Sequence, residues 1–221
     1  MTDENIRKSF AQEIEDLLHS VLEMGAMTED LIKGSVKALI EQDVALADKV
    51  IAADEEIDHK EIEIEEKCLR LLALQQPMAS DLRTIESVLK IITDVERLAD
   101  HTTKISKKAK ILAALPQLKP YVDLPKMAER VTEMFHLSLE AFVKKDAELA
   151  RKVIDMDDAV DEYNSRIFKE LVDFMIKDNN CISFVSHLMV VVQSLERIAD
   201  HVTNICERII YFTTGKLSKL N

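Results

Sequence analysis

The sequence contains the stretch Glu96-Arg97-Leu98-Ala99-Asp100-His101 and repeats it one hundred residues later as Glu196-Arg197-Ile198-Ala199-Asp200-His201. Repetition of this kind indicates one supersecondary unit used twice. Each copy holds a Glu and an Asp four residues apart, and on an α-helix that spacing stacks both carboxylates on one face. Two like charges so placed repel each other by roughly 0.2–0.5 kcal/mol. The repeated pair therefore predicts a positively charged group beside each copy.

The composition favours long helices around a hydrophobic core. Of the 221 residues, 47% are hydrophobic, whereas only 3 are Gly and 4 are Pro. Few helix breakers beside abundant Leu, Ile, Ala, Glu and Lys are typical of helical proteins. The formal net charge of −12 repels phosphate backbones, so we exclude nucleic acid as a partner. Such a surface suits cations.

The N-terminus and the cysteines indicate a cytoplasmic protein. Residues 1–4 are acidic and precede no apolar segment of the kind found in signal peptides. No apolar run reaches the ~20 residues needed to cross a bilayer. We therefore expect no direct membrane insertion, and any membrane contact at the inner face would come through partners. The cysteines form no Cys-x-x-Cys pair, which predicts buried thiols in a reducing compartment, at Cys68, Cys181 and Cys206.

The four prolines divide the chain. Pro77 stands alone, and Pro116, Pro120 and Pro125 lie together near the middle. Proline interrupts helices and is tolerated in their first turn. Apolar residues at helical spacing predict three helices on each side of this cluster, with Gly25 as a soft point in the first. The six predicted helices cover residues 6–42, 44–74, 78–115, 127–145, 146–177 and 181–212.

The predicted fold class is all-α, with two tandem antiparallel three-helix bundles related by an internal repeat of six long helices in total. The first bundle covers residues 1–115. A linker that contains proline follows at 116–125, and the second bundle covers 126–221.

Each half carries a second acidic pair on its middle helix, Asp54 with Asp58 and Asp157 with Asp161. Measured from the turn between the second and third helices, the two pairs of the first half differ in height by roughly 3 Å, or two residues. Those of the second half differ by roughly 4.5 Å, or three residues. Side chains span such offsets, so we expect four carboxylates to converge in each half.

Four convergent carboxylates raise one another's pKa unless a positive charge is present. They could be protonated, arginines could lie between them, or cations could bind, as they do at sites rich in oxygen ligands. Arg97 and Arg197 lie about 100° round the helix from the glutamates, which predicts that they face away. We favour cations, with a solvated acidic face as the alternative. We expect His101 and His201 to flank the sites without binding, and the charge run 59–66 to lie on the surface.

Two motifs make the chain resemble the PhoU family, the regulators of bacterial phosphate uptake. One is Gln76-Pro77-Met78-Ala79-Ser80-Asp81-Leu82-Arg83 before the first hexamer, and the other is the second hexamer followed by Asn204-Ile205. The resemblance covers nearly the whole chain, including its length, its repeat and its order of helices. It implies two three-helix bundles, each with a multinuclear cluster of divalent or trivalent metal ions. Iron or zinc is expected first, with magnesium, manganese or nickel as alternatives.

In the family, paired acid-x-x-x-Asp motifs on adjacent helices hold these ions. The resemblance implies a first site at Asp54, Asp58, Glu96 and Asp100, and a second at Asp157, Asp161, Glu196 and Asp200.

The chain departs from the family pattern after the first hexamer. Lys104 and Lys107 stand there where the second half has Asn204 and Glu207. Because Lys104 is four residues from Asp100, the two can form an ion pair. We therefore expect the first site to hold fewer ions or to bind them more weakly.

The resemblance also implies a function without an enzymatic reaction. The chain would be a metal-binding adaptor between a phosphate ABC importer and a phosphate-sensing histidine kinase, keeping the starvation response off when phosphate is plentiful. We also expect a homodimer. One alternative is a carboxylate-bridged metal-dependent enzyme, an oxidase or a phosphohydrolase, which would need an open coordination position and a substrate pocket. The other is a helical structural protein that binds no ion.

Overall fold

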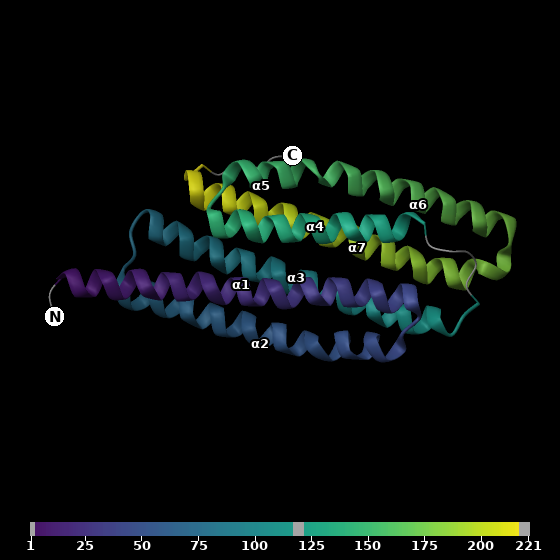
Figure 1. The fold of residues 1–221 in the computed structure, drawn as a ribbon, viewed down its shortest axis with the longest axis horizontal. Coiled ribbons are helices and arrows are strands. Elements are labelled where there is room, and N and C mark those ends of the chain that lie inside the picture. The colour runs from purple at the N-terminus through teal and green to yellow at the C-terminus, as the bar shows by residue number, and fades with distance from the viewer. Residues whose placement is uncertain (1–2, 117–121, 217–221) are drawn as a thin grey trace.

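Two bundles of long helices make up the structure. The computed structural model describes residues 3–116 and 122–216, and no strand occurs within them. The first bundle consists of α1 (Asp3–Glu41), α2 (Val44–Gln75) and α3 (Ser80–Ala113). The second consists of α4 (Asp123–Lys144), α5 (Ala147–Asp155), α6 (Asp157–Lys177) and α7 (Ile182–Thr214), with a short 3₁₀ helix at Asn179–Cys181. Figure 1 shows the bundles side by side with their long axes aligned. The predicted fold class is confirmed.

The predicted linker is only partly visible. Residues 117–121 lie outside the described residues, and α4 begins inside the predicted linker, at Asp123. Pro125 is therefore in the first turn of α4, where its missing N–H breaks no helical hydrogen bond. Pro77 lies in the turn before α3.

The first two helices of each bundle are joined by the same kind of turn. Gln42 and Lys145 end α1 and α4 with positive φ angles of 55° and 50°. An aspartate then begins the next helix. Asp43 accepts a hydrogen bond from a backbone amide of α2, and Asp146 accepts two from α5. Because such N-caps stabilise a helix by roughly 0.5–2 kcal/mol, each turn favours the antiparallel hairpin.

The second helix of the second bundle is divided, although the sequence predicts one helix over 146–177. The break lies at Met156, whose amide donates to the Val153 carbonyl at 3.1 Å. No glycine or proline accounts for it. As a result Asp157 lies in the first turn of α6, whereas its counterpart Asp54 lies inside the continuous α2.

The central helices α3 and α7 share the most extensive interface of the molecule. They run antiparallel, because Asp94 contacts His201, whereas Glu86, earlier in α3, lies 3.9 Å from Arg208, later in α7. The two hexamers cross at this interface through four side chains with no exposed surface, Leu98, Ala99, Ile198 and Ala199.

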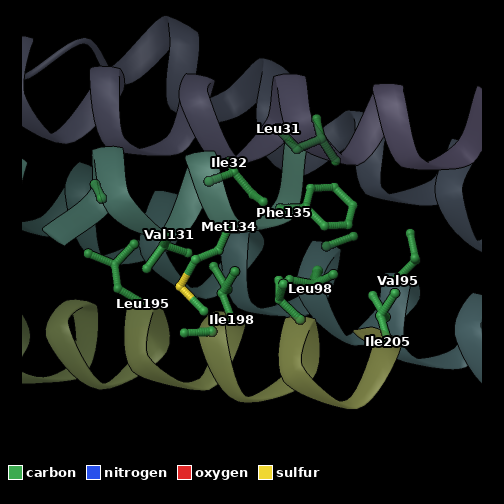
Figure 2. Packing of buried hydrophobic residues seen from close by; sticks show 14 of the residues in the cluster. Leu31, Ile32, Val95, Leu98, Val131, Met134, Phe135, Leu195, Ile198 and Ile205 are labelled. Carbon is green, nitrogen blue, oxygen red and sulfur yellow. The ribbon is translucent and has the colours of Figure 1, made fainter. Parts of the chain in front are cut away.

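One continuous core joins the two bundles. Figure 2 shows Ile32 of α1 and Phe135 of α4 on one side of this core, facing Leu98 and Ile198 of the central helices. The outer helix α2 packs against α1 and α3, whereas α5 and α6 pack against α4 and α7. The three cysteines are free and buried, as predicted.

Gly25 is a site of close helix packing, not the soft point that the sequence suggests. α1 continues through it without a break. A Cβ atom built on Gly25 would lie 2.6 Å from Leu139 Cδ2 of α4. A Cβ on Gly34 would similarly lie 2.9 Å from Val50 Cγ2 of α2. These glycines therefore let α1 approach both neighbours.

The helix α7 corrects one sequence-based expectation. The segment Asn179–Thr214 is long and apolar enough to cross a membrane, whereas no such run was expected. Half of its most apolar window is buried inside the protein, against helices of both bundles. Its apolar character is thus that of a central core helix.

Candidate metal centres

The carboxylates predicted for the first site gather between α2 and α3. Burial raises the pKa of Asp54, and the negative charges of Asp58 and Asp100 raise it further. Burial also raises the pKa of Glu96, on which Asp100 and Asp58 act in the same sense. Carboxylates on each of the two helices thus raise the pKa of carboxylates on the other helix. We call these four residues the first cluster.

The second cluster comprises Asp157, Asp161, Glu196 and Asp200, between α6 and α7. The pKa of Asp157 rises to about 6, because of burial first and then the charges of the other three. Burial, Asp200 and Asp161 likewise raise the pKa of Glu196. The structure therefore brings four acidic side chains together in each half, and they repel one another when ionised.

Arg97 and Arg197 pair with the hexamer carboxylates, so the prediction that they face away is wrong. Arg97 lies 3.2 Å from Asp100 and 3.3 Å from Glu96. Arg197 makes the same two contacts in the second hexamer, at 2.9 Å to the Asp and 3.6 Å to the Glu. Each long side chain reaches both acids despite the angular offset of its Cα. Both arginine side chains are about half exposed, and such pairs contribute only about 0–1 kcal/mol, so a cation can displace them.

Glu61 belongs with the first cluster, and sequence reasoning missed it. The run 59–66 was expected on the surface, but Glu61 is half-buried. Its pKa is raised by burial and then by the charges of Glu65 and Asp58, against the effect of a hydrogen bond from Thr93. The charge of Glu61 in turn raises the pKa of Glu96. The position of Glu61 could have been predicted from the sequence, because Glu61 is three residues from Asp58 and therefore lies on the same helix face.

Lys104 does not form the ion pair with Asp100 that its spacing suggests. In the part of the chain that the structure describes, Asp100 pairs with Arg97 and not with Lys104. Lys107 lowers the pKa of Asp54 and so offsets part of the negative charge. Glu61 adds a negative charge to the same cluster, whereas Lys107 offsets negative charge there, so the two residues have opposite effects on the attraction for a cation. The weaker first site stays a prediction.

The hexamer histidines meet across the α3–α7 interface. The ring centroids of His101 and His201 lie 5.9 Å apart, and His201 Nδ1 lies 2.9 Å from Asp94 Oδ1. The pKa of His101 falls to about 4, because burial and the positive charge of Lys104 disfavour its protonation. These histidines therefore belong to the contact between bundles.

The first cluster also contains a buried hydroxyl without a hydrogen-bonding partner. Thr103 is 5% exposed, and its hydroxyl lies close enough to Asp54 to lower the pKa of that carboxyl. It nevertheless forms no hydrogen bond of normal geometry. A buried polar atom of this kind is costly unless it is satisfied. A ligand bound among these carboxylates would supply the missing partner.

The carboxylates are close together but do not form a ligating arrangement in the described residues. Across residues 3–116 and 122–216, no three acidic, histidine or cysteine side chains converge enough to hold one ion together. Ionised carboxylates repel one another, and a cation would reduce that repulsion. The donors are carboxylate oxygen atoms, and this set fits hard or borderline cations.

These features define a class: a two-bundle helical protein with an acidic candidate cation site in each bundle. The sequence profile of the PhoU domain matches the chain twice, at residues 21–109 and 124–209. Each match covers most of one bundle. The chain belongs to the PhoU family.

Relatives and solved structures are similar over nearly the full length. The Clostridium acetobutylicum protein named "phosphate-specific transport system accessory protein PhoU homolog" is 39% identical over 216 residues, 97% of this chain and 99% of that protein. A protein of the same name from Aquifex aeolicus is 40% identical over 208 residues, 94% of each.

Two crystal structures share the fold. PhoU from Pseudomonas aeruginosa superposes with a TM-score of 0.91 at 38% identity, covering 94% of this chain and 100% of that one. The phosphate transport system regulatory protein PhoU from Streptococcus pneumoniae gives 0.89 at 31% identity, covering 96% and 100%.

Proposed function

We propose that this chain regulates phosphate uptake as an accessory protein of a phosphate-specific transport system. The observation that supports the proposal is the similarity of both bundles to PhoU relatives in sequence and to PhoU crystal structures in fold. Relatives with that name are about as long as this chain and 39–40% identical to it. The P. aeruginosa and S. pneumoniae proteins share its fold with TM-scores of 0.91 and 0.89.

Metal ions at the two clusters form the second part of the proposal. Asp54, Asp58, Glu96 and Asp100 would hold the first set of ions, with Glu61 beside them. The second set would bind at Asp157, Asp161, Glu196 and Asp200. Iron or zinc is proposed first, with magnesium, manganese or nickel as alternatives for ligands that are all oxygen. Bound ions would supply positive charge and tie the outer helix of each bundle to its central helix.

The regulatory step itself is proposed to be binding without catalysis. The chain would act as an adaptor between the phosphate ABC importer and a phosphate-sensing histidine kinase, and would work as a homodimer. It would reside in the cytoplasm and meet the inner face of the membrane through these partners. Holding the importer and the kinase together would keep the starvation response off when phosphate is plentiful.

Complementation tests this function. In a bacterium that lacks its own PhoU, we expect this chain to restore repression of a phosphate-starvation reporter in phosphate-rich medium. The double variant Glu196→Ala/Asp200→Ala should restore it poorly, because it loses half of the second cluster. Asp158→Ala removes an exposed carboxylate beside that cluster and serves as the matched control.

Two results would count against the proposal. Failure of the parent chain to repress the reporter, at normal protein level, would contradict the regulatory role. Full repression by the double variant would leave that role intact and contradict the part assigned to the metal ions. Immunoblotting of each strain excludes loss of protein as the cause.

A further inference from the structure

A cavity of about 220 Å³ opens beside the second cluster, between α6 and α7. It is smaller than the roughly 300–1,000 Å³ of sites for drug-sized ligands, so it suits a small guest. Two residues of the second hexamer, two residues with side-chain amides and three apolar residues line it: Glu196, Arg197, Asn164, Gln193, Phe168, Met189 and Val190. Because Glu196 is a predicted metal ligand, the cavity adjoins the proposed metal ions.

The two side-chain amides of this cavity are free to bind a guest. Among residues 3–116 and 122–216, neither the Asn164 nor the Gln193 side chain forms a hydrogen bond. Asn164 is half-buried, whereas Gln193 is exposed. Each side-chain amide has two N–H donors and one carbonyl acceptor. The wall can therefore donate hydrogen bonds to a guest and also accept one from it.

Arg197 is the cationic residue of the wall. In the structure its guanidinium pairs with Asp200 at 2.9 Å and with Glu196 at 3.6 Å. These pairs are about half exposed and therefore weak. A cation bound to the two carboxylates would release the N–H donors of Arg197 beside the cavity. A guanidinium group binds an oxyanion through two parallel hydrogen bonds.

The corresponding surface of the first bundle carries more negative charge. The helices α2 and α6 correspond to each other with an offset of 103 residues. Glu61 therefore stands at the position of Asn164, and Glu65 stands at the position of Phe168. Glu61 already accepts a hydrogen bond from Thr93. An anion would meet two additional carboxylates there, so the second bundle is the better suited of the two.

We propose that this cavity binds inorganic phosphate when cations occupy the second cluster. The inference rests on the proposed function, because the four carboxylates of that cluster would repel an anion without those cations. Arg197 would donate to two oxygen atoms of the phosphate ion, and Asn164 and Gln193 would donate to the others. An amide carbonyl would accept the P–OH hydrogen of hydrogen phosphate, which sulfate lacks. Cation and phosphate would then strengthen each other's binding.

Calorimetric titration of inorganic phosphate into the full chain tests the proposal. The chain is loaded with zinc and freed of unbound metal, and elemental analysis before and after the titration records the bound zinc. The chelator-treated chain should bind phosphate at least about tenfold more weakly than the zinc-loaded chain. Sulfate, and phenyl phosphate with a bulky ring in place of the P–OH hydrogen, should also bind the zinc-loaded chain at least about tenfold more weakly than phosphate.

Matched arginine substitutions in the two bundles locate the binding. Arg197→Gln should weaken phosphate binding at least about tenfold, because the cavity loses its guanidinium donors. It should retain its zinc, since the arginine competes with cations for the carboxylates. Arg97→Gln makes the same change in the first bundle and should leave phosphate binding unchanged. Equal effects of the two substitutions, or an unchanged affinity in Arg197→Gln, would overturn the proposal.

A glutamate at position 164 makes the second bundle resemble the first. Asn164→Glu should weaken phosphate binding at least about tenfold without loss of zinc, because a carboxylate then faces the anion. Ser165→Glu adds the same charge at an exposed neighbouring residue outside the cavity and is the matched control. Equal weakening by both substitutions would indicate a general effect of charge and would overturn the proposal.

The bound zinc distinguishes failure of this inference from failure of the proposed function. A parent chain that retains zinc but binds no phosphate would overturn the inference and leave the regulatory role intact. A parent chain that takes up no zinc would contradict the metal-binding part of the proposed function, and the inference with it. Sulfate or phenyl phosphate that binds as tightly as inorganic phosphate would overturn the inference alone.

Discussion

Neutralising Asp157 should make the metal-free protein more stable and should weaken its metal binding. In Asp157→Asn the side chain keeps its size and loses the charge that Asp161, Asp200 and Glu196 repel. A bound cation needs that charge, so the same substitution acts in opposite directions on the metal-free and metal-bound proteins.

The magnitude follows from the pKa of Asp157, which rises from 3.8 to about 6 in the folded chain. A difference of this size corresponds to roughly 3 kcal/mol for a fully buried group. Because Asp157 is only half-buried, solvent screening reduces the expected gain to about 1 kcal/mol at pH 7.5. The pKa lies above the unfolded value, so the gain shrinks as the pH falls through 6. It vanishes below about pH 4, where the carboxyl is protonated in both states.

Urea unfolding in the presence of a chelator measures this difference. Asp158→Asn is the matched control, because Asp158 is exposed and shares the first turn of α6 with Asp157. Both substitutions lose the same favourable contact with the helix N-terminus, worth roughly 0.3–1 kcal/mol. The comparison therefore reports mainly the burial of the Asp157 carboxylate and its repulsion by Asp161, Asp200 and Glu196, because Asp158 adds the smallest of these effects. Calorimetric metal titration of both variants should show weaker binding for Asp157→Asn alone.

Two results would contradict this explanation. The first is a metal-free Asp157→Asn protein that is no more stable than Asp158→Asn at pH 7.5. The second is an advantage that grows as the pH falls, because the sign of the pKa change would then be wrong.

Other predictions follow from the same structure. The metal-free protein should become more stable as the pH falls from 7 to 5, because the pKa of carboxyl groups such as Asp157 is higher in the folded than in the unfolded state, so the folded state binds more protons. A loss of stability over this range in urea unfolding would contradict this prediction. Gly25→Val should cost roughly 1–3 kcal/mol by overpacking against Leu139, and adding Leu139→Ala should cost less than the sum of the two single changes in thermal unfolding. Asp146→Ala should cost about 1 kcal/mol, because α5 loses its N-cap; an unchanged urea midpoint would show that the cap is unimportant.

The fold could be predicted because its signals are local and repeated. The scarcity of Gly and Pro, the helical spacing of apolar residues and the second hexamer were enough for two three-helix bundles. Counting residues from each turn also placed Asp54 near Asp100 and Asp157 near Glu196, since the helical rise is fixed.

Other features depend on three-dimensional contacts that spacing does not contain. The helix break at Met156 could not be predicted, because no glycine or proline lies there in the sequence. Arg97 was assigned by its Cα direction, but its long side chain reaches both hexamer acids. The crossing of Leu98 and Ile198 depends on how the two bundles pack. Glu61 could have been found, because its distance from Asp58 is readable in the sequence.

Elemental analysis tests the central claim most directly, namely that each acidic cluster holds cations. The parent chain, Asp200→Ala and the exposed-site control Asp158→Ala should be purified without oxygen and dialysed before analysis. We predict retained iron, zinc or another divalent metal in the parent and the control, and a clear loss in Asp200→Ala. A parent chain that retains no metal, or an Asp200→Ala protein that retains as much as the parent, would contradict the claim.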